Sequence, residues 1–241
     1  MYSNKNFIDE LLQNKSTRSL IFPVILGCIS VLILLTANRC IEALHTDNLL
    51  KQKYYLYNSI FFTSIILIPF IRTFKNELII LFKTNWRQIK GATIFLLVTL
   101  FFIFVFHTGI LKVIFGFDLA SGFEITQNPF LSDPNPLSIL RLLKFSIQLI
   151  GEELLFFSIF FLSYMVGKRI VPHSIPIIPI SVLISIFLFG LIHLPTYDYN
   201  VIQCVFVGSG FAIRTLLFLK YQNITLCYLA HFLMDFYVVL N

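Results

Sequence analysis

Charged residues are scarce in this chain of 241 residues. Asp, Glu, Lys and Arg together make up 12% of it, whereas soluble domains contain roughly 25%. Hydrophobic residues make up 57%, and the mean hydropathy is +0.85. This composition excludes an ordinary soluble domain and indicates an integral membrane protein.

Cysteine is also scarce. The four cysteines have neither the paired spacing of a zinc ribbon nor the density of a disulfide framework; they are Cys28, Cys40, Cys204 and Cys227. The chain has no glycine-rich phosphate loop and no H-E-x-x-H motif. These absences exclude a disulfide-stabilised secreted domain and the most familiar nucleotide and metalloprotease sites.

Basic residues outnumber acidic ones, 18 to 12, which gives a net charge of +6. They are scattered between apolar blocks and form no single stripe. We therefore expect no nucleic-acid partner, and we expect the basic flanks to contact membrane lipid.

Seven segments are long and apolar enough to cross a hydrocarbon layer of about 30 Å. They are 20–38, 54–71, 91–115, 137–166, 175–195, 201–219 and 223–240. The pattern predicts an all-α fold, a polytopic transmembrane helical bundle of about seven spans. The segment 73–90, with Trp86 among basic residues, is typical of an interfacial segment.

The basic residues between these spans are unevenly distributed. The side that holds the N-terminus has eleven of them, namely Lys5, Lys15, Arg18, Arg72, Lys75, Lys83, Arg87, Lys90, Lys168, Arg169 and Lys220, and the other side has four, namely Arg39, Lys51, Lys53 and Lys112. The positive-inside rule then predicts a cytoplasmic N-terminus and an external C-terminus. Abundant Ile, Phe, Lys and Asn favour a bacterial plasma membrane.

Ionisable residues become frequent only within the last four spans. We therefore predict two regions. Residues 1–136 form an N-terminal transmembrane region of three spans, an interfacial segment and an outer loop at 116–136. Residues 137–241 form an intramembrane core that holds the candidate functional residues.

Two adjacent carboxylates, Glu152 and Glu153, lie in the fourth span, where an ionisable side chain costs about 2.5 to 3.5 kcal/mol on insertion scales. Adjacent helical positions differ by about 100°, so the two side chains face different neighbours. Glu152 lies one turn after Gln148 on a polar row, which assigns Glu152 to a cavity. The alternative is a buried ion pair that only fixes helix packing.

Two histidines accompany these carboxylates. His193 lies one turn after Phe189 at the end of the fifth span, and His231 lies one turn before Asp235 in the seventh. A carboxylate one turn from an imidazole can orient its ring and fix its tautomer.

The three motifs together, Glu152-Glu153, Phe189-x-x-x-His193 and His231-x-x-x-Asp235, resemble the CAAX prenyl protease and bacteriocin-processing family of intramembrane proteases. The resemblance covers about residues 137–240. The family has an arginine where this chain has Phe157. Arg214 in the sixth span is a candidate replacement as the partner of Glu153, although it can instead extend toward the cytoplasmic surface.

The resemblance implies that Glu152 activates the attacking water and that His193 assists proton transfer. It also implies that His231 and Asp235 polarise the scissile carbonyl, with Asp235 alternatively orienting His231. The predicted function is an intramembrane endopeptidase that acts on a peptide or lipidated protein, in peptide maturation, signal processing or bacteriocin self-immunity.

Two other interpretations stay open. One is a zinc metalloprotease with His193, His231 and Glu152 as ligands, although the leading interpretation needs no cofactor. The other is a catalytically inactive scaffold or regulator of the same fold, which the missing arginine favours. The sequence specifies neither the substrate nor the oligomeric state.

Overall fold

The computed structural model describes residues 4–105, 138–172, 174–197 and 199–240. These residues form nine helices and no strand. The helices are α1 (Asn4–Leu12), α2 (Thr17–Glu42), α3 (Asn48–Thr73), α4 (Leu78–Phe82), α5 (Trp86–Val105), α7 (Ile139–Ile170), α8 (Ile177–Ile192), α9 (Val201–Tyr221) and α10 (Ile224–Leu240). The predicted all-helical bundle is confirmed.

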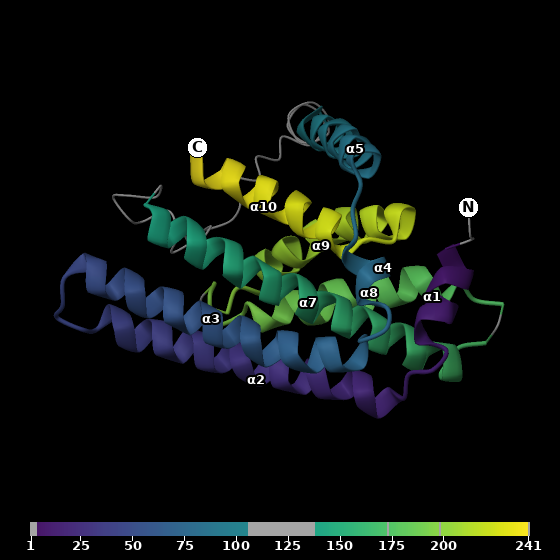
Figure 1. Ribbon diagram of the computed structural model, residues 1–241, viewed down its shortest axis with the longest axis horizontal. Helices are drawn as coiled ribbons and strands as arrows, with labels where there is room; N and C mark the ends of the chain where they lie inside the picture. Colours follow the sequence, from purple (N-terminus) through teal and green to yellow (C-terminus); the bar gives the residue numbers. More distant parts are fainter. Residues whose placement is uncertain (1–3, 106–137, 173, 198, 241) are drawn as a thin grey trace.

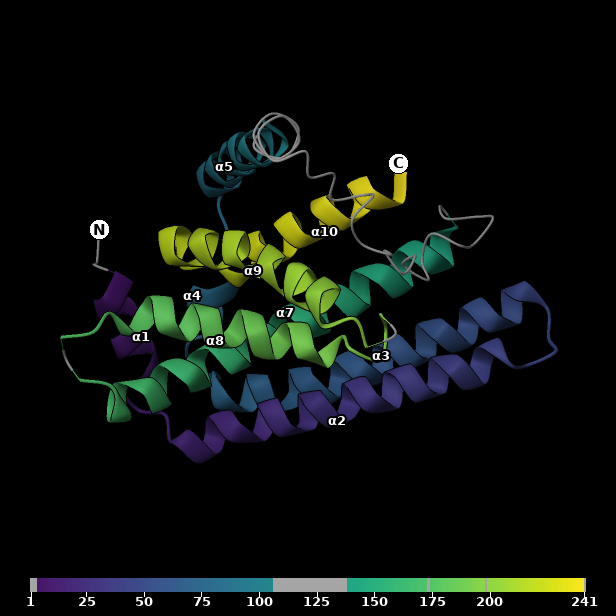
Figure 2. The same cartoon turned by 180° about the vertical axis from the view of Figure 1, so that it is seen from behind.

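The long helix α7 lies at the centre of the bundle (Figure 1). Helices α2 and α3 form an antiparallel pair that packs along one side of α7. Helices α8 and α9 cover the other side (Figure 2), and α10 packs against α9 and α7. The last three helices of the chain therefore lie near the middle of α7, where the two glutamates lie.

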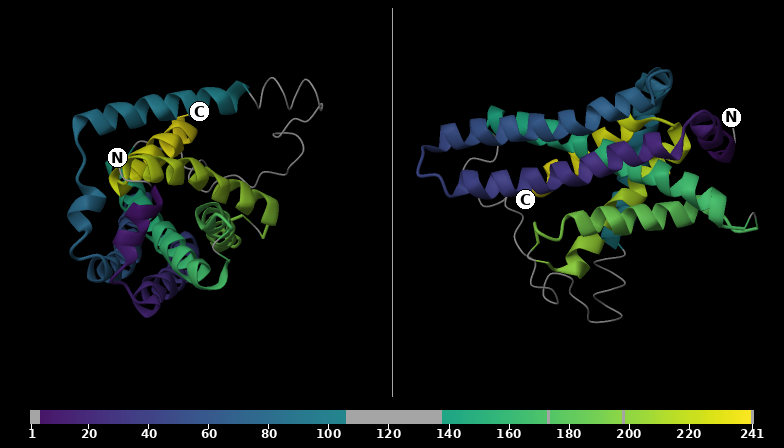
Figure 3. Two further views of the ribbon diagram at one scale, coloured as in Figure 1. Left: turned by 90° about the vertical axis from the view of Figure 1, so that its right-hand side faces the viewer. Right: turned by 90° about the horizontal axis from the view of Figure 1, so that it is seen from below.

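Each predicted span coincides with a helix. Three helices, α2, α3 and α7, are long and apolar enough to cross a membrane over their described residues. The third predicted span, 91–115, coincides with α5 as far as Val105. Helix α5 runs across the long helices instead of along them (Figure 3), because the chain turns at α4 before α5 begins.

The hydrophobic core continues across the predicted boundary between the two regions. Gly27 of α2 allows the side chain of Leu155 of α7 to approach closely: a Cβ at Gly27 would lie 2.4 Å from a Leu155 methyl carbon. One buried cluster contains residues from α1 to α5 and from α7 to α10. The boundary at Pro136 and the predicted outer loop 116–136 lie outside the described residues, so the two-region division stays a prediction.

Two short helices pack against this core near the start of α2. Helix α1 was not expected among the polar N-terminal residues, yet its Phe7 and Ile8 are buried. In the predicted interfacial segment, Leu81 of α4 is fully buried while Trp86 is 78% exposed. The segment therefore contributes Leu81 to the core and keeps other apolar side chains, Ile79 and Trp86 among them, on the surface.

Candidate active site

Helix α7 presents its two adjacent glutamates to different surroundings. The side chain of Glu153 is 1% exposed, and that of Glu152 is 16% exposed. Glu152 Oε1 accepts a hydrogen bond of 2.9 Å from Gln148 Nε2, one turn earlier. The predicted division, in which Glu152 lies on the more open side and Glu153 faces neighbouring helices, is present in the structure.

Glu153 lies between a guanidinium and an imidazole. Its Oε1 is 3.0 Å from Arg214 Nε of α9 and 2.8 Å from His231 Nδ1 of α10. These are ion-pair distances whose angles fall short of hydrogen-bond alignment. One carboxylate thus links three helices at the centre of the bundle.

Two further contacts hold Arg214 in addition to its ion pair with Glu153. Only 3% of the residue is exposed, and its guanidinium carbon lies 3.4 Å from the centroid of the Phe211 ring, a cation–π contact. The backbone oxygen of Arg214 also accepts a hydrogen bond from Cys227 Sγ at 3.2 Å. The alternative in which Arg214 extends toward the membrane surface is therefore wrong, because its side chain turns inward to Glu153.

Phe157, which stands where the family has arginine, is fully buried among aromatic rings. Its ring centroid lies 4.7 Å from that of Phe218, which is one turn beyond Arg214 on α9. In this chain the positive charge beside Glu153 thus comes from α9, and an aromatic contact occupies the position of Phe157.

His231 lies among three carboxylates. Besides Glu153 at Nδ1, its Nε2 is 3.4 Å from Asp235 Oδ2 and 4.0 Å from Glu152 Oε2. The Asp235 side chain is 42% exposed, whereas that of His231 is only 5% exposed. Glu153 therefore holds the inner ring nitrogen, and the other nitrogen faces the space between Glu152 and Asp235.

His193 ends α8 at the same level of the bundle. Its Nδ1 lies 3.0 Å from the backbone oxygen of Phe189. The Phe189 ring contacts both the His193 ring, at 4.9 Å between centroids, and the Phe211 ring, at 4.2 Å. Phe211 in turn lies 5.2 Å from the His231 ring. A continuous aromatic contact thus connects the two histidines, and Phe189 is part of it.

Tyr197 is a residue that the sequence reasoning missed. It lies in the connection between α8 and α9, is 8% exposed, and its ring stacks near His193 with centroids 6.4 Å apart. Burial, followed by the negative charges of Glu152 and Asp235, raises the pKa of Tyr197 to about 12. The four-residue spacing from His193 was the available signal, since it continues the spacing from Phe189 to His193.

Across the described part of the chain, no three His, Cys, Asp or Glu side chains are arranged so as to hold a metal ion. Of the residues named as alternative zinc ligands, Glu152 and His231 lie 4.0 Å apart, and His193 is linked to His231 through the rings of Phe189 and Phe211. Their nitrogen and carboxylate atoms here contact one another or the backbone.

Residues 134–237 match the family model for Rce1-like proteins, described as type II CAAX prenyl endopeptidase Rce1-like. The matched segment contains every candidate site residue, and it confirms the resemblance that the three motifs indicated. This segment of the chain is thus similar to CAAX-type intramembrane proteases. No curated protein and no solved structure matched the chain in the other two comparisons.

Proposed function

We propose that this protein is an intramembrane endopeptidase in which Glu152 activates the water that attacks a peptide bond. The observation that carries the proposal is the unequal environment of the two glutamates. Glu153 is neutralised by Arg214 and inaccessible, whereas Glu152 is partly exposed and faces His231. A carboxylate that can reach a bound water can act as its general base.

The reaction would proceed by direct attack of water. As the water oxygen bonds to the scissile carbonyl carbon, Glu152 takes one water proton. The carbonyl oxygen becomes an oxyanion, which His231 Nε2–H can stabilise. The carbon–nitrogen bond then breaks, and the leaving nitrogen receives a proton from Glu152 with the assistance of His193.

In this scheme Asp235 does not donate a hydrogen bond to the oxyanion. An ionised carboxylate accepts hydrogen bonds and cannot donate one. Its Oδ2 lies 3.4 Å from His231 Nε2, so we assign it to orienting that imidazole. Glu153 performs the corresponding task at Nδ1, and Arg214 balances its charge.

The substrate would be a hydrophobic peptide or a lipidated protein presented at the membrane. Peptide maturation, signal processing and self-immunity against a bacteriocin all need this chemistry. A panel of prenylated and unmodified peptides, assayed with purified protein, separates these substrate classes.

The first prediction is that Glu152→Gln abolishes cleavage without unfolding the protein. The amide keeps the size of the side chain and a hydrogen bond to Gln148 but removes the basic oxygen, so we expect a loss of about 10²- to 10⁴-fold in kcat. Ser158→Ala is the matched control on α7, because the Ser158 hydroxyl donates a hydrogen bond to Leu154 O of its own helix. Cleavage rate and the yield of monodisperse protein are the two measurements.

The same assay distinguishes the alternatives. Loss of activity with a strong chelator and recovery with added zinc would establish the metalloprotease mechanism. The inactive-scaffold alternative has a specific observation in its favour, the arginine missing at Phe157. It would be established if the biological phenotype survives Glu152→Gln, His193→Ala and His231→Ala alike.

A further inference from the structure

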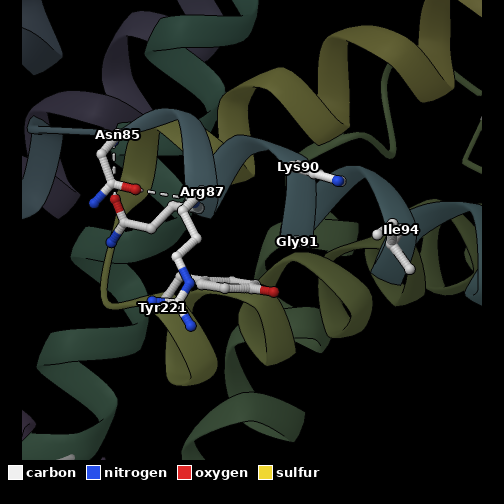
Figure 4. Close-up of a pocket in the computed structure, with 7 residues that line it drawn as sticks. Asn85, Arg87, Lys90, Gly91, Ile94 and Tyr221 are labelled. Carbon is white, nitrogen blue, oxygen red and sulfur yellow. Dashed lines mark hydrogen bonds between the residues drawn. The ribbon is translucent and has the colours of Figure 1, made fainter.

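A pocket separate from the glutamate site lies between the start of α5 and the last turn of α9 (Figure 4). Its volume is about 400 Å³, and its lining residues are Asn85, Arg87, Gln88, Lys90, Gly91, Ile94 and Tyr221. Figure 4 shows Arg87 extending from α5 toward the Tyr221 ring of α9. The two helices therefore share the walls of this cavity.

The pocket is positively charged. Arg87 and Lys90 are both exposed, and Lys220 lies beside the pocket with its Nζ 5.3 Å from the centroid of the Tyr221 ring. No acidic residue lines the cavity, and neither Arg87 nor Lys90 has an ion pair within the described residues. Two basic residues and a phenol thus line the pocket, a third basic residue lies beside it, and none of the described lining residues is acidic.

The acceptor atoms of the two lining amides are already engaged. Asn85 Oδ1 accepts a hydrogen bond from the Gln88 backbone at 2.9 Å, and Gln88 Oε1 accepts one from the Asn85 backbone at 3.1 Å. The side chains of Asn85 and Gln88 therefore offer a ligand their NH2 donors. Together with the cationic side chains and the Tyr221 hydroxyl, these donors suit a phosphate group.

The rim of the pocket is apolar and faces outward. Trp86 is 78% exposed and Ile94 is 53% exposed. Tryptophan beside basic residues is typical of the headgroup level of a bilayer. An anion that enters between Arg87 and Lys90 can therefore extend an acyl chain along Ile94.

We propose that the pocket between α5 and α9 binds the headgroup phosphate of an anionic phospholipid, with Arg87, Lys90 and Lys220 as its cationic contacts. The occupant is a membrane lipid because this end of the protein carries an excess of basic residues and the rim is apolar. The lipid would connect α5, which runs across the bundle, to α9. This proposal is independent of the proteolytic function.

The absence of a side chain at Gly91 keeps the pocket open for such a headgroup. A Cβ at this position would lie 2.5 Å from the Tyr221 hydroxyl oxygen, so a side chain here displaces the phenol into the cavity. Gly91→Val therefore fills the pocket and leaves every charge in place.

The test measures lipid binding to the purified full chain in neutral detergent. Phosphatidylglycerol or phosphatidylcholine is added, and bound lipid is counted by native mass spectrometry while the thermal midpoint is recorded. We expect phosphatidylglycerol to bind and raise the midpoint, and phosphatidylcholine to do neither. Equal effects of the two lipids would overturn the proposal.

Variants locate the binding site. Arg87→Gln with Lys90→Gln should weaken phosphatidylglycerol binding about thirtyfold, because each basic side chain near an anionic surface contributes roughly fivefold. Arg72→Gln with Lys75→Gln is the matched control, since it removes the same charge from the same end of the protein outside the pocket. Equal losses in the two double variants would show general surface attraction and overturn the proposal.

Two further arms complete the test. Gly91→Val should lose phosphatidylglycerol binding although its charge is unchanged, and normal binding would place the lipid elsewhere. Glycerol phosphate and inorganic phosphate should not reproduce the shift in midpoint. If they do so at comparable concentration, the ligand is a soluble phosphate and the lipid assignment is wrong.

Discussion

Glu152 and Glu153 are neighbours in the chain, but their surroundings give them separate tasks. Glu153 is enclosed by Arg214 and His231, so its charge serves to hold three helices and to orient an imidazole. Glu152 keeps an oxygen toward a partly open space. A rotation of about 100° per residue is sufficient to separate a structural carboxylate from a catalytic one.

At the residue scale, the second prediction concerns the Arg214–Glu153 pair. Arg214→Gln leaves a buried carboxylate without its counter-charge, and we expect it to cost about 3 to 5 kcal/mol of stability. Glu153→Gln in that background should recover part of this loss. Thermal or denaturant unfolding in detergent of both single variants and the double variant measures the coupling.

If the two changes are additive, the residues do not interact and the replacement of the family arginine by Arg214 is wrong. The Arg214→Lys variant provides a control. It retains the charge but lacks the planar group that lies over Phe211, so it should fall between the wild type and Arg214→Gln.

The third prediction concerns Tyr197. Its raised pKa, about 12, means that the neutral phenol is stabilised in the folded protein. The corresponding stability is present below pH 10 and is lost only as the pH rises through about 12. Tyr197→Phe keeps the ring beside His193, so we expect less than about tenfold loss in kcat/KM and an unchanged pH profile between pH 6 and 9.

The pH–rate profiles of wild type and Tyr197→Phe, measured side by side, check this expectation. A displaced alkaline limb in the variant would mean that Tyr197 ionises during catalysis. Tyr197→Ala removes the ring as well and should reduce activity further, because His193 loses a packing neighbour.

At the scale of elements, the close approach of α8 and α9 positions the site. A Cβ at Gly190 would lie 2.5 Å from the backbone oxygen of Cys204, and one at Gly208 would lie 2.3 Å from that of Ile186. A backbone oxygen cannot move away by a rotamer change, as a side chain can. These two glycines therefore bring His193, at the end of α8, close to the helix that carries Arg214.

The fourth prediction follows from this contact. Gly208→Ala should separate α8 from α9, with a destabilisation of about 1 to 3 kcal/mol and a parallel loss of cleavage. Gly210→Ala is the control on the same helix, because a Cβ there meets only Arg214 Nη1 at 4.0 Å. Unfolding midpoints and cleavage rates are measured for both, and equal behaviour of the two variants would contradict the proposed role of the contact.

At the scale of the whole molecule, the basic residues are unevenly distributed between the two ends of the bundle. The start of α2 and the ends of α3, α7 and α9 lie toward the end of the molecule where α1 lies (Figure 1). Arg18, Arg72, Lys168, Arg169 and Lys220 belong to these ends, whereas Arg39 and Lys51 belong to the other. The asymmetry counted along the sequence is thus an asymmetry between the two ends of the bundle.

The fifth prediction is the orientation in the membrane. The positive-inside rule places the end that carries α1 in the cytoplasm and the end of α10 outside. A reporter fused after Lys90 should report the cytoplasm, and one fused after Asn241 should report the exterior. If both report the same side, the number of spans is even and one of the seven predicted spans does not cross.

The sequence by itself determined the helical class, the approximate positions of the long helices and the residues that gather at the site. These properties depend on local hydrophobicity and on the helical period, which a single chain displays directly. Gln148 contacts Glu152, and His231 contacts Asp235, as their four-residue spacing predicted.

Contacts between helices were decided by the tertiary structure alone. The inward turn of Arg214, the burial of Phe157 against Phe218 and the position of Tyr197 depend on how α7, α9 and the α8–α9 connection are rotated and packed. Helix α1 also becomes visible only through the core that covers its apolar side. A spacing along one helix shows which side chains share a face, but the neighbour of that face is selected by packing the whole bundle.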